Sequence, residues 1–216
     1  MGGVKFAAII GICVLTLASC SSRYQQENGI WSWVTYDEAA GKRIHEIQGI
    51  DHETFEVLSQ SDYGRDADKV YYKGREIEGA DPNTFSPIGV ARYSKDKNRV
   101  FLEHCQLIFS DPETFEILDF PYSKDKKYAY CGTIPIQVED LRNFHVTKAS
   151  RMQVNSSLGH LIEKNPELEW LKDANTEYAI YGYGDLAKAE TDTEKFESFK
   201  KVETNTHNRH HCRTVE

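Results

Sequence analysis

The sequence predicts a mainly all-β fold, in which tandem units of about 30 residues, each made of short antiparallel strands, form a meandering or solenoid-like sheet. Two recurring patterns predict it. One starts with tyrosine, continues to an aspartate and ends in an apolar triplet, at Tyr63–Tyr72, Tyr93–Leu102 and Tyr122–Cys131. The other runs from aspartate to phenylalanine, at Asp51–Phe55, Asp81–Phe85, Asp111–Phe115 and, in degenerate form, Asp140–Phe144. Repeats of this length indicate one small unit, copied and stacked.

Each unit is predicted to hold three short strands and one turn. Thr84–Ile88, Lys69–Lys73 and Arg75–Ile77 contain aromatic or β-branched residues that suit a pleated surface. Gly74 can take the positive φ of a tight hairpin turn. The stretch around Asp66 is typical of turns, because a carboxylate accepts hydrogen bonds from nearby backbone N–H groups.

A unit of this size cannot bury an apolar face by itself, so we expect stacked units to share a core. Equally spaced phenylalanines, with small apolar residues beside them, form the expected spine: Phe55, Phe85 and Phe115, with Val70, Val100 and Ala129. Binding specificity is then expected at outward positions that vary between units, rather than at the repeated aspartates and phenylalanines.

The spacing of the repeats predicts how the chain is divided into segments. We expect a leader at 1–19, a tether at 20–29, the repeat array at 30–145, a partly helical insertion at 146–173, a degenerate terminal repeat at 174–202 and a disordered tail at 203–216. Asn165-Pro166 is a helix-start signal inside the insertion. The polar, His-rich composition of the tail is the reason for expecting disorder there.

The first residues are typical of an export signal. Lys5 precedes the apolar run Phe6–Leu17, which is too short to span a bilayer as a mature helix. Leu17-Ala18-Ser19-Cys20 resembles a bacterial lipobox, and that resemblance implies cleavage before Cys20 and attachment of acyl chains such as palmitate to it. An uncleaved anchor is the alternative. The serines at 21–22, with no aspartate beside the cysteine, resemble lipoproteins sorted to the outer membrane, facing the periplasm.

Charge restricts the partners. The chain has a formal net charge of −8, and loss of the leader with Lys5 would leave 25 basic against 34 acidic residues, about −9. An acidic surface argues against nucleic acid and anionic lipid headgroups as ligands. It is compatible with a basic protein partner.

Three cysteines remain beyond Cys13 and Cys20, and they allow three single bridges. A disulfide is permitted in an oxidising compartment. Cys105 and Cys131 lie in neighbouring repeats, so a bridge between them would join adjacent units and add about 3–4 kcal/mol to stability. Cys212 would then be left over in the tail.

Signals for chemistry are weak. The sequence has no nucleophile elbow, phosphate loop or dinucleotide fingerprint, so no catalytic, cofactor or metal site is predicted. Three weaker alternatives are catalysis by His104 and Cys105, metal binding by His207–Cys212, and calcium binding by loops such as Asp66–Asp68. A packed or bridged thiol, a polar tail and turn capping are favoured instead. Tyr71, Tyr72, Tyr128 and Tyr130 could form an exposed recognition surface, but such residues are more often half core and half cross-strand ladder.

Tyr93-Ser-Lys-Asp-Lys-Asn-Arg-Val-Phe101, together with Gly79-Ala-Asp-Pro-Asn-Thr-Phe85, resembles the signature of the DKNYY family. The resemblance covers about residues 45–145 well and 174–199 loosely. It implies repeats and often a bacterial envelope location, but no reaction. His104 replaces the turn glycine Gly74, so that unit is expected to turn differently.

These observations favour a non-enzymatic envelope lipoprotein that binds another, basic protein. A specific version is an immunity or inhibitor protein against a secreted toxin that acts at the membrane. The alternatives are a structural envelope spacer or assembly factor and, less favoured, a hydrolase that uses 146–173 as a lid.

Overall fold

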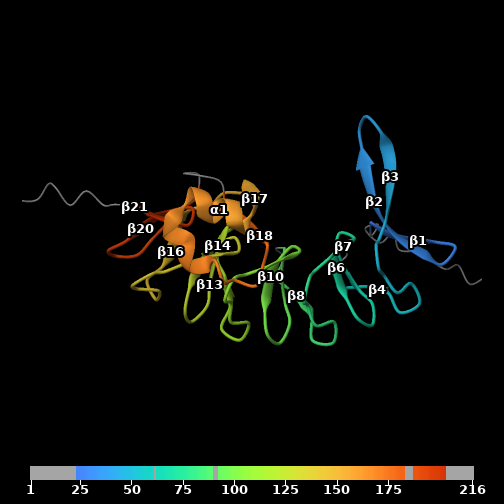
Figure 1. The fold of residues 1–216 in the computed structure, drawn as a ribbon, viewed down its shortest axis with the longest axis horizontal. Helices are drawn as coiled ribbons and strands as arrows, with labels where there is room; N and C mark the ends of the chain where they lie inside the picture. Colours follow the sequence, from blue (N-terminus) through green and yellow to red (C-terminus); the bar gives the residue numbers. More distant parts are fainter. Residues whose placement is uncertain (1–22, 61, 90–91, 183–186, 203–216) are drawn as a thin grey trace, which may run out of the picture.

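The computed structural model describes residues 23–60, 62–89, 92–182 and 187–202, and its repeat units lie side by side in one row (Figure 1). Each unit is a four-stranded antiparallel sheet whose strands adjoin in chain order, which confirms the predicted fold class. The first three units comprise β4 (Glu56–Val57), β5 (Tyr63–Arg65), β6 (Val70–Tyr72) and β7 (Arg75–Glu76); β8 (Ser86–Ile88), β9 (Tyr93–Lys95), β10 (Val100–Leu102) and β11 (Cys105–Gln106); β12 (Glu116–Ile117), β13 (Tyr122–Lys124), β14 (Ala129–Cys131) and β15 (Ile134–Ile136).

The structure has one more strand per unit than we predicted. The additional strand is β5 in the first unit, and β9 and β13 are its counterparts in the next two. β5 pairs with β6 across the aspartate turn, so that Tyr63 lies opposite Tyr72. At three residues, such a strand is too short to show the alternation of apolar and polar residues by which strands are recognised. Its pairing brings the repeated tyrosine into the core, where Tyr63 is 1% exposed.

A column of aromatic rings runs through the row and confirms the predicted spine. Each repeated phenylalanine packs against a tyrosine from the preceding sheet, with ring centroids 5.3 Å apart for Tyr24–Phe55, 5.6 Å for Tyr63–Phe85, 5.5 Å for Tyr93–Phe115 and 5.9 Å for Tyr122–Phe144. Val70, Val100 and Ala129 are fully buried beside them. Burying one phenylalanine stabilises the fold by about 1.5–3 kcal/mol, so the units depend on one another for their cores.

The repeated aspartates join the turn of each unit to the Asp-to-Phe motif of the same unit through backbone N–H groups. Oδ1 of Asp96 accepts two N–H groups of its own turn, both at 2.7 Å, while Oδ2 accepts the N–H of Asp81 at 3.0 Å. Asp66 and Asp125 make the equivalent bonds. The aspartates therefore accept hydrogen bonds in their own turns, as predicted. Each also accepts a backbone hydrogen bond from the adjoining Asp-to-Phe motif.

The fourth unit is interrupted by a long insertion. Its strands are β16 (His145–Lys148), β19 (Lys188–Glu190), β20 (Lys195–Glu197) and β21 (Lys200–Val202), in the order β16-β19-β20-β21. The predicted boundaries differ from this pairing, because they placed an insertion at 146–173 between two units and a separate terminal repeat at 174–202. Strand pairing instead places Asp140–Phe144 and residues 188–202 in one unit, and residues 149–187 between its first two strands.

The insertion folds as a strand pair that carries two short helices and lies against the third and fourth units (Figure 1). Its elements are β17 (Gln153–Ser157), the helix α1 (Leu158–Lys164), the 3₁₀ helix η1 (Pro166–Leu171) and β18 (Tyr178–Gly182). The backbone of β18 is docked directly, because Ile180 O accepts the Thr133 N–H at 2.7 Å. A Cβ on Gly132 would lie 2.1 Å from that oxygen, so only glycine fits there.

The N-terminal sheet begins earlier than predicted. It comprises β1 (Tyr24–Glu27), β2 (Ile30–Asp37) and β3 (Gly41–Glu46), and the β2–β3 hairpin stands off the row (Figure 1). Tyr24 is 4% exposed, so the predicted tether at 20–29 is corrected: the folded chain already includes β1. Residues 1–19, Cys20 and the predicted tail 203–216 lie outside the described residues. No helix in the described ranges is long and apolar enough to cross a membrane.

Candidate functional site

His104 and Cys105, the disfavoured alternative for catalysis, line a depression of about 260 Å³ between the first two units and the insertion. Its lining includes Arg75, Arg99, His104, Cys105, Asn175 and Tyr178. Burial lowers the pKa of His104, and burial raises the pKa of Cys105 to about 11. At neutral pH Cys105 is therefore a thiol, which is a far weaker nucleophile than a thiolate.

The predicted disulfide is not formed, because Cys105 and Cys131 are both free thiols. The two cysteines occupy different positions of the repeat. Cys131 lies opposite Ile134 across the β14–β15 hairpin, and it is Ile134 that holds the repeat position of Cys105. The Cys131 sulfur instead faces the insertion and accepts the Gly182 N–H at 3.4 Å.

No group of three or more His, Cys, Asp or Glu side chains among the described residues is placed to hold a metal ion. In the loop considered for calcium, both Asp66 oxygens already accept hydrogen bonds from backbone N–H groups. The alternative metal-binding stretch His207–Cys212 lies outside the described residues.

Most of the tyrosines considered as a recognition surface are in the core. Tyr71, Tyr72 and Tyr130 are buried, and the hydroxyl of Tyr130 donates to Asp125 at 2.7 Å. Tyr128 is partly exposed, and it belongs to a surface cluster that the sequence did not reveal.

This aromatic cluster consists of Phe109, Tyr128 and Trp170. The centroids of Phe109 and Tyr128 lie 6.4 Å apart, those of Phe109 and Trp170 6.1 Å, and those of Tyr128 and Trp170 5.9 Å. Phe109 follows the second unit, Tyr128 lies in the third and Trp170 lies in η1, so three separate segments build one surface. Phe109 is 44% exposed, although a large aromatic ring is usually buried.

Phe109 also has an unfavourable backbone conformation. Its φ is +61°, in the left-handed region, and the equivalent positions of the other units hold Gly49 at +67° and Gly79 at +73°. A non-glycine residue in this region costs about 1–2 kcal/mol. The chain therefore places a bulky, exposed ring where glycine would be unstrained, and such strain is characteristic of functional positions. Comparing Phe109 with Gly49 and Gly79 in the sequence could have found this residue.

The edge of the cluster is charged. Glu167 and Glu169 precede Trp170 within η1, and both are exposed. Glu167 pairs with Lys200 at 3.8 Å and Glu169 with Lys172 at 3.4 Å. Lys127 lies 5.0 Å from the centroid of the Tyr128 ring, so this ring already attracts one cation. Aromatic faces beside carboxylates are suited to lysine and arginine side chains, through cation–π attraction and ion pairing together.

The family assignment rests on two matched stretches. The model of the DKNYY family matches residues 10–105 and 106–212. No curated protein and no solved structure matches the chain. The matched stretches contain all the repeat units described above. The chain therefore belongs to the DKNYY family.

Proposed function

We propose that this protein is a lipid-anchored protein of the bacterial envelope that binds a basic protein partner through the aromatic cluster. The observation that carries the proposal is Phe109, an exposed ring held at a left-handed position that other units give to glycine. Aromatic residues contribute most of the affinity in many protein interfaces. The side chains of the repeated motifs pack and form hydrogen bonds within the array. Recognition is therefore expected at non-repeated positions such as Phe109 and Trp170.

The charge of the chain supports a basic partner. The formal net charge is −8, and Glu167 and Glu169 lie beside Trp170. Complementary charge accelerates association and makes it weaken as salt rises. The specific version of this function is immunity or inhibition, in which the protein neutralises a secreted toxin that acts at the membrane. A lipid on Cys20 would anchor the protein at that membrane.

The test uses the mature chain carrying Cys20→Ser, which keeps it free of lipid. The chain is immobilised and exposed to envelope extracts at low and at high salt, and captured proteins are identified by mass spectrometry. We expect a basic protein that is captured at low salt and lost in Phe109→Gly and in Trp170→Ala. Tyr178→Ala is the matched control, because it removes another exposed aromatic ring from the insertion.

Glycine suits the backbone at position 109, so Phe109→Gly is expected to fold. Circular dichroism and thermal unfolding check this directly. Equal capture by the parent chain and by both cluster variants would contradict the proposed surface. The absence of any specific capture at low salt would contradict the binding function.

The elongated row of units also supports a second candidate, an envelope spacer or assembly factor (Figure 1). Deletion of the gene would then weaken the envelope in cells that meet no toxin. Restoration of envelope integrity by the Phe109→Gly chain would favour the spacer over recognition by the cluster.

A further inference from the structure

One face of the N-terminal sheet carries three exposed apolar side chains, although Val34 on the same face is only 1% exposed. Alternation in β2 points Trp33 toward the array, where its Cβ lies 2.6 Å from the position that a Cβ on Gly74 would take. The opposite face presents apolar side chains to solvent: Ile30 is 49% exposed, Tyr36 68% and Ile44 55%. Ile44 lies opposite Val34, and Val34 shares the parity of Ile30 and Tyr36, so all three exposed residues are on this face.

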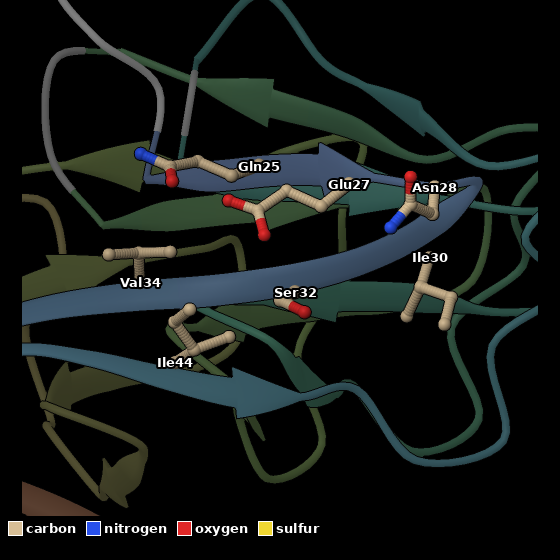
Figure 2. Close-up of a pocket in the computed structure, with 7 residues that line it drawn as sticks. All are labelled: Gln25, Glu27, Asn28, Ile30, Ser32, Val34 and Ile44. Carbon is tan, nitrogen blue, oxygen red and sulfur yellow. The ribbon is translucent and has the colours of Figure 1, made fainter.

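A shallow depression of about 230 Å³ lies on the same face (Figure 2). Its lining includes Gln25 and Glu27 from β1, Ile30 and Val34 from β2, and Ile44 from β3. The nearby charges partly compensate each other, because Lys42 pairs with Glu27 at 3.7 Å. The face is therefore apolar at its centre and close to neutral at its edge.

The length of chain before this sheet limits what can cover it. Only residues 21–23 separate Cys20 from the first residue of β1, Tyr24. A fully extended chain spans about 3.5 Å per residue, so the Cα of Tyr24 lies within about 14 Å of the Cα of Cys20. A lipid on Cys20 would therefore hold the sheet at the bilayer surface.

We propose that the Ile30–Tyr36–Ile44 face rests on the membrane, with these side chains at the boundary between zwitterionic headgroups and acyl chains. The inference depends on the lipid anchor of the proposed function. Tyrosine has an apolar ring and a polar hydroxyl and is favoured at this boundary. Three side chains bind a bilayer weakly, but the tether makes the contact intramolecular, at an effective concentration in the millimolar range. The contact fixes the orientation of the repeat array relative to the membrane.

The test places tryptophan on the face. The full chain is expressed with its own leader in a bacterial host, purified in detergent and reconstituted into phosphatidylcholine vesicles with or without brominated acyl chains. The added tryptophan of Tyr36→Trp is expected to lose most of its emission to bromine. Tyr178→Trp is the matched control, since Tyr178 is 49% exposed on the insertion and its emission should be unchanged. Adding Ile44→Glu to Tyr36→Trp should restore the emission while the lipid keeps the protein on the vesicle.

The outcomes separate the two proposals, because mass spectrometry of the N-terminal peptide reports acylation of Cys20 independently. An unmodified Cys20 would overturn both the anchor and the membrane contact. If Cys20 is acylated but the tryptophan added by Tyr36→Trp is not quenched, the membrane contact alone is overturned. Blue-shifted but unquenched emission would show that protein, such as a second copy of this chain, covers the face instead.

Discussion

The first three units and the fourth unit have the same order of four strands, but different side chains hold the strands in place. In a regular unit one aspartate closes its own turn and also binds the adjoining motif, as Asp125 does with the N–H of Asp111 at 2.9 Å. In the fourth unit two residues share these roles. Thr191 Oγ1 accepts N–H groups of the turn, and Glu194 Oε2 accepts the N–H of Glu139 at 2.8 Å.

The comparison shows which contacts the array requires. The turn after the second strand and the bond to the adjoining motif persist in both versions, so they define the unit. The link between the first and second strands is free to change, because it holds residues 149–187 in the fourth unit and only a few residues elsewhere.

Asp125→Ala is expected to have the largest effect. It leaves three backbone N–H groups and the hydroxyl of Tyr130 without their acceptor, which costs about 3–5 kcal/mol of unfolding free energy. Thr191→Ala removes only the turn acceptor and should cost about 1–2 kcal/mol. Urea unfolding measures both. Equal losses in the two variants would contradict the division of roles in the fourth unit.

Gly132→Ala is expected to cost more than about 2 kcal/mol and to loosen β18, because the new Cβ would meet the Ile180 carbonyl of the docked insertion. Lys73→Ala is the matched control. Lys73 is the equivalent turn residue of the first unit, at φ +51°, and it already carries a Cβ. Its replacement should stay within about 0.5 kcal/mol. Hydrogen exchange of β18 measures the loosening, and unchanged exchange in Gly132→Ala would contradict the docking.

Acidification is expected to weaken the regular units. Burial tends to raise the pKa of Asp66, but bonds from the N–H groups of Asp51 and of its own turn outweigh burial and lower that pKa below its ordinary 3.8. A carboxyl with a lowered folded-state pKa stabilises the fold above its unfolded-state pKa, and this stabilisation is lost as pH falls through the folded-state value. The urea midpoint should therefore be nearly constant above about pH 5 and fall below about pH 4. Asp66→Asn should show a shallower fall, and an identical pH profile would contradict this role.

Reducing agent is expected to have the smallest effect. Because Cys105 and Cys131 are free, dithiothreitol should leave the melting temperature of the purified protein unchanged. A bridge between them would be worth about 3–4 kcal/mol, so a large drop on reduction would contradict the free thiols. Alkylation of the native chain should also spare both thiols, since they are buried.

Sequence reasoning found the features that recur. The period, the phenylalanine spine and the turn role of Asp66 follow from repetition, because equal spacing of like residues indicates equal environments. Sequence reasoning missed the strand that contains Tyr63, because three residues show no periodicity. It also placed Asp140–Phe144 and Phe196 in different units, because strands that pair across a long insertion leave no local signal in the sequence.

The aromatic cluster was missed for a related reason. Phe109, Tyr128 and Trp170 come from three segments, and only the docking of the insertion brings them together. Phe109 alone carried a sequence signal, through its replacement of a repeated glycine. Residues that break a repeat are therefore as informative about function as residues that maintain it.

The location of the insertion has a practical use for protein engineering. The fourth unit shows that the connection between the first and second strands of a unit accepts dozens of extra residues without loss of strand order. The corresponding connection between β8 and β9 is thus a rational place to graft a fluorescent reporter or an epitope, because chain tips joining adjacent strands tolerate additions best. A reporter placed there would track the protein in living cells while leaving both termini unaltered.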